Sequence, residues 1–450
     1  MKKKIIIAGA SVALIAIISV SLYAYHIYSV VEGYSNKIYP GVQIEGVNLS
    51  NKTKDQAEKL LESKFQTAIG NKKVNIQVGD KTYSITYEKL DANFDINAKV
   101  EEAFEYGKNE NHLSQYELIQ KAAKKSYNLT FTYNEKPLDD LISNIDKATN
   151  ISAVNGKITK NGSDFEITDD KDGYKVNDAQ LKKDLAAGIN SSIGADTTVK
   201  ANIETVKAKV TKEKLQTINT LISTFSTNYG SISSASRVTN IQLATAAING
   251  LCLMPGDTFS FNGTVGERTP QRGYQSAPVD IGDSVGLGYG GGICQVSSTM
   301  YNAVLLAGIL PTVREHHSIP SIYVPLGQDA TIDWGDLDYQ FKNTLNYPIY
   351  IEGSSANGIE TFNIYSNSSL TSKTYKVVND VYAQLQPTTQ YVDDPTMPAG
   401  QTEVEQSPSI GHQVKVYLET FQNGNMIAKD TVSNDTYDAI NAIIKRGTKQ

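Results

Sequence analysis

The most distinct pattern in the chain is a continuous apolar run near its start. Residues 5–25 contain no charged side chain and follow Lys2, Lys3 and Lys4. At about 1.5 Å per residue, a helix of this length crosses a hydrocarbon core of about 30 Å. The pattern predicts a transmembrane anchor over residues 1–31, with the lysines in the cytoplasm and the rest of the chain outside the cell. A cleaved signal peptide is the alternative, although no Ala-x-Ala site closes the run.

Short strand-like and helical patterns follow, and they occur twice. In each copy a strand-like segment and an Asn-containing turn precede a helical stretch. The first copy comprises residues 85–97 with the helical residues 99–106, and the second comprises 167–177 with 179–189. We interpret the copies as an internal duplication of a small α+β unit, with domains over residues 32–130 and 131–212.

The duplicated unit resembles the peptidoglycan-binding domain that precedes the catalytic domain in some bacterial L,D-transpeptidases. The resemblance rests on the succession of a strand, the turn Gly173-Tyr-Lys-Val-Asn177 and a helix. It implies that the two copies hold glycan strands. A stalk that only lifts the next domain away from a membrane is the alternative.

The rest of the chain divides into a mixed segment and a β-rich tail. Residues 211–225 predict a helix that leads into a third domain over 213–365, and 319–324 is a strand-like run within it. Residues 354–372, rich in Ser, Thr and Asn, are interpreted as a linker. Beyond it, alternating apolar and polar residues predict a small all-β domain over 375–450.

The tail resembles the G5 domain, a small β module attached to many wall-active proteins. The matching residues are Pro398-Ala-Gly400, Ile410-Gly411, Asn423-Gly424 and Arg446-Gly-Thr-Lys449. The resemblance implies binding to wall glycans. Together these patterns predict an α+β multidomain protein: an N-terminal transmembrane helix, two α+β repeats, a mixed α+β domain and a C-terminal β module.

The net charge and the number of cysteines exclude some classes of partner and of fold. The formal net charge is −6, so no basic field is available to neutralise phosphates, and nucleic acid is excluded as a partner. Two cysteines in 450 residues do not form a disulfide framework. Cys252 lies in an apolar stretch and is expected to be a small buried hydrophobe, with a bridge to Cys294 as the alternative.

Cys294 has a different context, because a glycine-rich loop runs into the helix that contains it. The segment Gly286–Gly308 carries an apolar stripe at helical spacing, and Cys294 falls in the first turn. Unpaired N–H groups and the helix dipole favour a thiolate there. The backbone of Gly291 and Gly292 can approach a substrate and stabilise an oxyanion. We interpret Cys294 as a nucleophile; the alternative is a buried cysteine beside a tight loop.

A cysteine nucleophile requires a base, and candidates follow the helix. His317 is the predicted general acid and base, whereas the neighbouring His316 can face solvent. Asp329 and Asp338 are the candidates for orienting the histidine, and a role in turns is the alternative for both. Zinc held by the cysteine and both histidines is disfavoured, since adjacent histidines on a strand point to opposite sides. No metal and no cofactor are expected.

Further candidates concern substrate binding. Arginine offers a rigid fork for carboxylates, and the stem peptides of the cell wall carry carboxylates. The predicted substrate-binding residues are Arg237, Arg314, Gly291, Gly292 and Ser298. Structural ion pairs are the alternative for each arginine.

Residues 228–353 resemble a VanW domain over their whole length. The marks include Ser236-Arg-Val-Thr-Asn240, Pro255–Asn262, Gly290-Gly-Gly-Ile-Cys-Gln-Val-Ser-Ser298, His317-Ser318, Tyr323-Val-Pro-Leu-Gly327, Asp329-Ala-Thr331 and Phe341-Lys-Asn343. The family often has the pattern Glu-Arg-His-x-His-Ser, which this chain departs from at 313–318. Only the second family histidine maps onto this sequence, at His317.

The resemblance implies a peptidoglycan L,D-transpeptidase, in a family linked to glycopeptide resistance. Cys294 would attack the carbonyl of the third residue of a donor tetrapeptide stem and release terminal D-alanine. A side-chain amine of a neighbouring stem would then take the acyl group. The expected partners are stem peptides and glycan strands. A carboxypeptidase or endopeptidase, and a non-catalytic wall-binding protein, are the alternatives.

Overall fold

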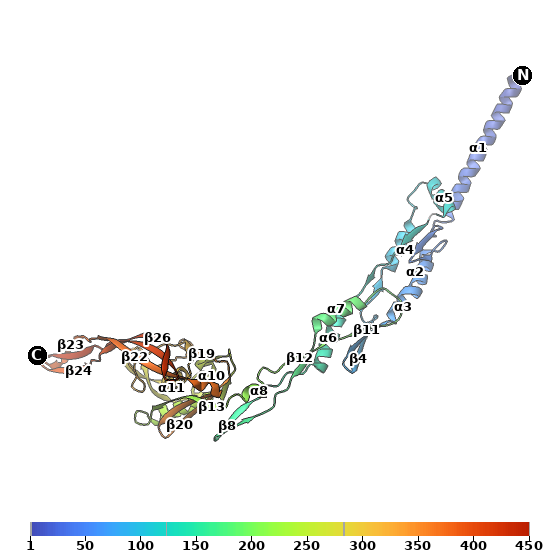
Figure 1. The fold of residues 1–450 in the computed structure, drawn as a ribbon. Helices are drawn as coiled ribbons and strands as arrows, with labels where there is room; N and C mark the ends of the chain where they lie inside the picture. Colours follow the sequence, from blue (N-terminus) through green and yellow to red (C-terminus); the bar gives the residue numbers. More distant parts are fainter. Residues whose placement is uncertain (1, 123, 282–283, 450) are drawn as a thin grey trace. The chain divides into compact units, whose positions relative to one another are not determined.

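The computed structural model describes residues 2–122, 124–281 and 284–449 (Figure 1). The chain forms two compact units. The first unit holds the chain up to Ala153 together with Asp172–Lys207, and the second holds Val154–Lys171 and the chain from Ala208 onward. The predicted α+β multidomain fold class is confirmed, with one apolar N-terminal helix and an all-β module at the other end.

Helix α1 (Lys2–Glu32) opens the first unit. It is the one helix of the described chain that is long and apolar enough to cross a membrane, judged by length and composition. Its last turns belong to the folded unit, because Ile27 and Val31 are buried in the core. Tyr116 of α5 (His112–Lys121) packs its ring against His26. The apolar helix is therefore continuous with the folded unit.

Small sheets and short helices make up the rest of the first unit. The sheets are β2 (Val47–Asn48)–β1 (Val42–Ile44)–β6 (Lys125–Tyr127), β11 (Thr197–Lys200)–β3 (Lys73–Val78)–β4 (Lys81–Thr86), β5 (Asn93–Phe94)–β7 (Phe131–Thr132) and β10 (Gly173–Val176)–β12 (Ile203–Val206). The helices are α2 (Lys54–Leu61), which a Thr53 capping box begins, α3 (Thr67–Gly70), α4 (Ile96–Glu105), α6 (Lys136–Thr149) and α7 (Asp178–Gly188).

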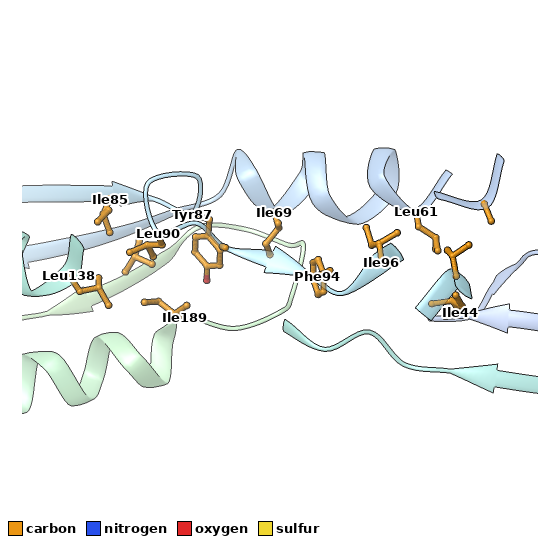
Figure 2. Close-up of a cluster of buried hydrophobic side chains, with 14 of the residues drawn as sticks. Ile44, Leu61, Ile69, Ile85, Tyr87, Leu90, Phe94, Ile96, Leu138 and Ile189 are labelled. Carbon is orange, nitrogen blue, oxygen red and sulfur yellow. The ribbon is translucent and has the colours of Figure 1, made fainter. Parts of the chain in front are cut away.

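The two sequence copies share one core in this unit. Each copy forms a hairpin, a short strand and a helix: β3–β4, β5 and α4 in the first, and β8 (Ile158–Asn161)–β9 (Asp164–Ile167), β10 and α7 in the second. Strand β11 pairs in parallel with β3, and Leu138 and Ile189 are buried in the same core as Tyr87 and Leu90 (Figure 2). The hairpin β8–β9 packs instead in the second unit. The predicted domain boundaries within 32–212 stay predictions.

A four-stranded antiparallel sheet carries the second unit. Its order is β13 (Thr220–Asn228)–β21 (Ile359–Ser366)–β20 (Ile349–Ala356)–β14 (Leu251–Leu253), and helices α9 (Ala235–Ile248) and α11 (Ile293–Leu305) pack on it and on each other. Its smaller elements are α8 (Lys212–Leu215), α10 (Phe261–Val265), the sheet β15 (Thr258–Ser260)–β19 (Gln340–Lys342)–β18 (Pro311–Val313) and the hairpin β16 (Ser276–Ile281)–β17 (Ser284–Tyr289).

Three local predictions for this unit are wrong. The helix expected over 211–225 is only the short α8, because the run from Thr220 to Asn228 alternates and forms the sheet edge β13. The expected linker at 354–372 contains the end of β20 and all of β21, whose alternate side chains are buried. Residues 319–324 form no strand.

The C-terminal β module consists of two three-stranded sheets and packs on the rest of this unit. The sheets are β22 (Lys373–Leu385)–β25 (Gly411–Gln422)–β26 (Asn425–Tyr437) and β23 (Thr389–Pro398)–β27 (Ala442–Lys449)–β24 (Thr402–Gln406). Leu418 of β25 is buried in the same core as α11. Gly327 has a φ of +80°, and a Cβ there would clash with the side chain of Val416. Glycine at 327 therefore permits the contact with the module.

We expect Gly327→Ala to lower the free energy of unfolding of this unit by about 3 kcal/mol, from about 1–2 kcal/mol of left-handed strain plus overpacking against Val416. Gly400→Ala is the matched control, since φ there is +88° and no atom lies within 4 Å of the added Cβ. Thermal unfolding followed by the fluorescence of Trp334, the one tryptophan of the chain, measures both. Equal losses in the two variants would contradict the packing argument.

Candidate functional site

Cys294 lies in the first turn of α11, after a glycine loop. The conformation of Gly292 and hydrogen bonds from Asn240 fix the shape of this loop. Gly292 has a φ of +101° and precedes the helix. The buried amide of Asn240 on α9 donates to the carbonyls of Gly291, at 3.1 Å, and Gln275, at 2.9 Å. Cys294 is half-buried, and its Sγ atom lies 3.6 Å from the carbonyl oxygen of Ile332. The loop and the helix together hold the sulfur at a defined point.

Two serines that follow the cysteine fasten α11 to the segment that carries the candidate aspartate. The hydroxyl of Ser297 donates to the carbonyl of Ala330 at 2.6 Å. The hydroxyl of Ser298 donates to the carbonyl of Cys294 at 2.7 Å and accepts from the N–H of Ala330 at 2.9 Å. Ser298, predicted to bind substrate, is fully buried and joins the helix to this segment instead.

His317 and Asp329 form a buried pair beside the sulfur. The Asp329 Oδ2 atom lies 2.6 Å from His317 Nδ1 and accepts from the His317 backbone N–H at 2.7 Å. Because Nδ1 is engaged by the carboxylate, Nε2 is the ring nitrogen left for the hydrogen bond with Cys294. The structure thus brings together Cys294, His317 and Asp329, with His317 between the other two. This is the arrangement of a thiol nucleophile, its base and a carboxylate that orients the base.

The pKa values of the three groups shift so as to favour an ion pair. Burial alone raises the pKa of the Cys294 thiol, but the hydrogen bond and positive charge of His317 bring it below its usual value. Burial lowers the pKa of His317, and its bonds to Asp329 and Cys294 outweigh that effect and raise it. Burial raises the pKa of Asp329, yet the bond with His317 holds it below its usual range. The shifts at Cys294 and His317 therefore both favour the thiolate and the imidazolium over the neutral thiol and imidazole.

A cleft of about 820 Å³ opens over the sulfur. Arg237, Arg268, Gly291, Gly292, His317 and Tyr323 line it together with Cys294. Large apolar side chains with high exposure also line the cleft: Ile232, Leu287, Tyr289, Ile322 and Trp334. A ligand bound here would displace water from these apolar side chains, close to the Cys294 sulfur.

The two arginines predicted to bind substrate lie in different places. Arg237 lines the cleft, and its Nη1 donates to the Ser233 hydroxyl at 2.6 Å. Arg314, the other predicted carboxylate ligand, is almost fully buried behind the site, where it pairs with Asp329 and Asp435. Arg268 takes its place in the cleft: its charge contributes to lowering the Cys294 pKa.

Asp338, the other candidate for orienting the histidine, and His316 both have other hydrogen-bond partners. Asp338 accepts from the Ser260 hydroxyl at 2.6 Å and from the Asn262 N–H at 2.8 Å, so it has the turn role left open as its alternative. The Nδ1 atom of His316 lies 2.7 Å from the carbonyl oxygen of His317. His317 is paired with Asp329 rather than with Asp338.

Cys252 provides an internal contrast to Cys294. Both cysteines are free thiols. Cys252 lies on β14 among apolar side chains, and burial raises the pKa of its thiol to about 12. Within the described ranges 2–122, 124–281 and 284–449, no group of three His, Cys, Asp or Glu side chains is arranged to hold a metal ion.

Comparison with known proteins assigns the same segments to three families. The family described as "VanW like protein" matches residues 236–365, "Putative peptidoglycan binding domain" matches 83–198, and "G5 domain" matches 376–449. The chain carries a VanW-like domain. The peptidoglycan-binding match runs as one stretch from the first expected repeat into the second. Together these domains support a cell-wall-related role.

Two curated relatives match parts of the chain. "Uncharacterized protein YoaR" of Bacillus subtilis (strain 168) is 41% identical over 169 residues, which cover 38% of this chain and 56% of the relative. "Vancomycin B-type resistance protein VanW" of Enterococcus faecalis (strain ATCC 700802 / V583) is 28% identical over 132 residues, 28% of this chain and 48% of the relative. The chain spans about half the length of these curated relatives.

One solved structure, the IgA1 protease G5 domain, is 19% identical and covers 17% of this chain and 92% of its own. Its TM-score of 0.15 is too low to bear on the fold.

We expect Cys294 to react with iodoacetamide at a pH well below the usual thiol pKa, while Cys252 stays unlabelled. In His317→Ala the midpoint of the pH–rate curve should rise by about one unit or more, because the imidazolium that stabilises the thiolate is gone. Peptide mapping by mass spectrometry measures each cysteine separately. Equal labelling of both cysteines in the folded wild-type chain would contradict the low-pKa thiolate.

Proposed function

We propose that the VanW-like domain is a peptidoglycan L,D-transpeptidase that works by cysteine acyl transfer. The observation that carries this proposal is the set of Cys294, in the first turn of α11, and His317, which line one cleft, with Asp329 buried behind His317. The pKa values of Cys294 and His317 are shifted towards a thiolate and an imidazolium. The peptidoglycan-binding and G5 matches support a wall substrate.

In the first step, the thiolate of Cys294 attacks the carbonyl carbon of the third residue of a donor tetrapeptide stem. The negative charge that develops on the carbonyl oxygen lies at the N-terminal end of α11, where the helix dipole favours an anion. The N–H groups of Ile293 and Gln295 in this turn donate to the carbonyls of Gly290 and Gly292. His317 gives its Nε2 proton to the leaving nitrogen of D-alanine as the C–N bond breaks. The products are a thioester on Cys294 and free D-alanine.

In the second step, a side-chain amine of a neighbouring stem attacks the thioester. His317, now neutral, takes the proton of the amine, and the C–S bond breaks to restore the thiolate. Asp329 keeps Nδ1 protonated and the ring oriented in both steps, as it accepts from Nδ1 at 2.6 Å. A new amide joins the two stems.

The apolar lining of the cleft favours transfer over hydrolysis. Ile322 is 80% exposed and Leu287 is 75% exposed in the free protein, although both line the cleft that holds Cys294. A bound acceptor stem would cover such side chains and exclude water from the thioester. Carboxypeptidase activity is the second candidate, since the same three residues would hydrolyse the thioester if water reached it.

Features of the first unit support a location of the protein between the outer face of the cell membrane and the cell wall. Helix α1 has the length and composition of a membrane span, and it continues into a unit that matches a peptidoglycan-binding family. We propose that the helix is a single-pass anchor with its N-terminus in the cytoplasm and that both folded units face the wall.

Incubation of the full chain in detergent with disaccharide-tetrapeptides, followed by mass spectrometry, tests the reaction. We expect a dimer that lacks one D-alanine, and none with Cys294→Ala. Cys252→Ala is the matched control and should retain full activity, because its thiol lies outside the cleft. A trimmed monomer that depends on Cys294 would establish hydrolysis instead, and no change with a folded protein would contradict an enzyme.

A variant of the cleft lining tests the water-exclusion argument. Ile322→Ser should raise the ratio of trimmed monomer to dimer several-fold, because a polar, smaller side chain admits water to the thioester. Val404→Ser is the control, since Val404 is 59% exposed but lies in the C-terminal module outside the cleft. The two product masses give the ratio directly, and an unchanged ratio in Ile322→Ser would count against this role of the lining.

A further inference from the structure

The C-terminal module contributes side chains to the buried rear of the candidate active site. Tyr437, the last residue of β26, donates its hydroxyl to Oδ1 of Asp329. The same hydroxyl accepts from the backbone N–H of Gly327 at 2.7 Å. Burial raises the pKa of Tyr437, so the hydroxyl stays protonated and remains a donor. A residue of the module therefore bonds directly to the carboxylate that holds His317.

A second connection from the module reaches the same carboxylate through Arg314. Asp435 of β26 accepts from Arg314 Nη1 at 2.6 Å, and Arg314 Nη2 donates to Asp329 Oδ1 at 3.2 Å. Arg314 also donates through Nε to the backbone carbonyl of Asp329 at 2.7 Å. The side chains of Arg314 and Asp435 are each 5% exposed. Such a buried guanidinium requires its counter-charge, because an uncompensated buried charge is strongly destabilising.

The two oxygens of Asp329 thus have separate tasks. Oδ2 accepts the two N–H groups of His317, and Oδ1 accepts from Arg314 and Tyr437. The module supplies Tyr437 itself and, in Asp435, the counter-charge of Arg314. Without Tyr437, the Asp329 carboxylate would lose a hydrogen-bond donor. Without Asp435, Asp329 would be the remaining carboxylate partner of Arg314 and would interact with its full charge.

The module also makes hydrogen bonds to the residues next to His317 and Asp329. The N–H of Asp438 donates to the carbonyl of Ser318 at 2.9 Å, one residue after His317. Gln328 donates to Asn379 of β22 at 3.1 Å, one residue before Asp329. These bonds attach the module on both sides of the pair formed by His317 and Asp329.

We propose that Tyr437 and Asp435 are positioning residues of the active site, and that the C-terminal module is a structural part of it. They act through Asp329: they fix its Oδ1 so that its Oδ2 stays on His317 and the imidazolium stays beside the sulfur. This role deepens the proposed function and rests on it for its catalytic meaning, but the geometry can be tested on the thiol alone.

The test is the pH dependence of Cys294 alkylation by iodoacetamide, on the full chain in detergent. Tyr437→Phe keeps the ring and removes only the hydroxyl. We expect it to raise the midpoint by about half a pH unit, which slows labelling about threefold below the midpoint. Tyr382→Phe is the matched control, because it removes an exposed hydroxyl of the same module that donates to Asn434 at 2.9 Å. The control should keep the wild-type midpoint.

A second variant keeps the test decisive if Tyr437→Phe does not fold. Asp435→Asn leaves the Tyr437 hydroxyl in place and directs the charge of Arg314 onto Asp329, so it should shift the midpoint in the same direction. Loss of stability alone would lower the melting temperature and leave the midpoint unchanged. A folded variant of either kind with the wild-type midpoint would overturn the proposal. Slow labelling of Cys294 in the wild-type chain would instead contradict the proposed function.

Discussion

Asp329 is a carboxylate with 1% exposure, and it stays ionised only because hydrogen bonds and charges compensate its burial. His317 contributes on one oxygen, and Arg314 and Tyr437 contribute on the other. The position of the imidazole follows from this arrangement, and the state of the Cys294 thiol follows from the imidazole. The site therefore depends on the buried carboxylate of Asp329. Its hydrogen bonds connect the segment after α11 with the C-terminal module.

The central part of the site could be predicted from the sequence because its signals are local. A glycine run ahead of an apolar stripe at helical spacing places Cys294 in a first turn, and the structure has α11 there. The VanW-like motifs pointed to His317 and left Asp329 as a candidate. The alternating pattern of the tail predicted a β module. Each of these inferences needs only neighbouring residues, for which period and turn chemistry are sufficient.

The rest required three-dimensional partners that sequence spacing does not specify. Asp338 and Asp329 have similar local contexts, and only the fold shows that Asp338 bonds to Ser260. Arg314 has the chemistry of a carboxylate ligand, but its partners are buried carboxylates of the chain itself. Tyr437 carried no signal at all, since one tyrosine among 26 becomes informative only when its hydroxyl is seen against Asp329. The segment 354–372 looked like a linker because polar residues on the exposed face of β21 hid its alternation.

An acyl-enzyme on Cys294 would distinguish the proposed transpeptidase from every non-catalytic alternative. The full chain would be incubated with a disaccharide-tetrapeptide whose side-chain amine is acetylated, so that it can donate an acyl group but cannot accept one. Intact-protein mass spectrometry, followed by peptide mapping, would locate any adduct. The account predicts an added mass equal to the substrate less one D-alanine, on the peptide that contains Cys294. A folded protein that binds the substrate and carries no adduct on that cysteine would contradict it.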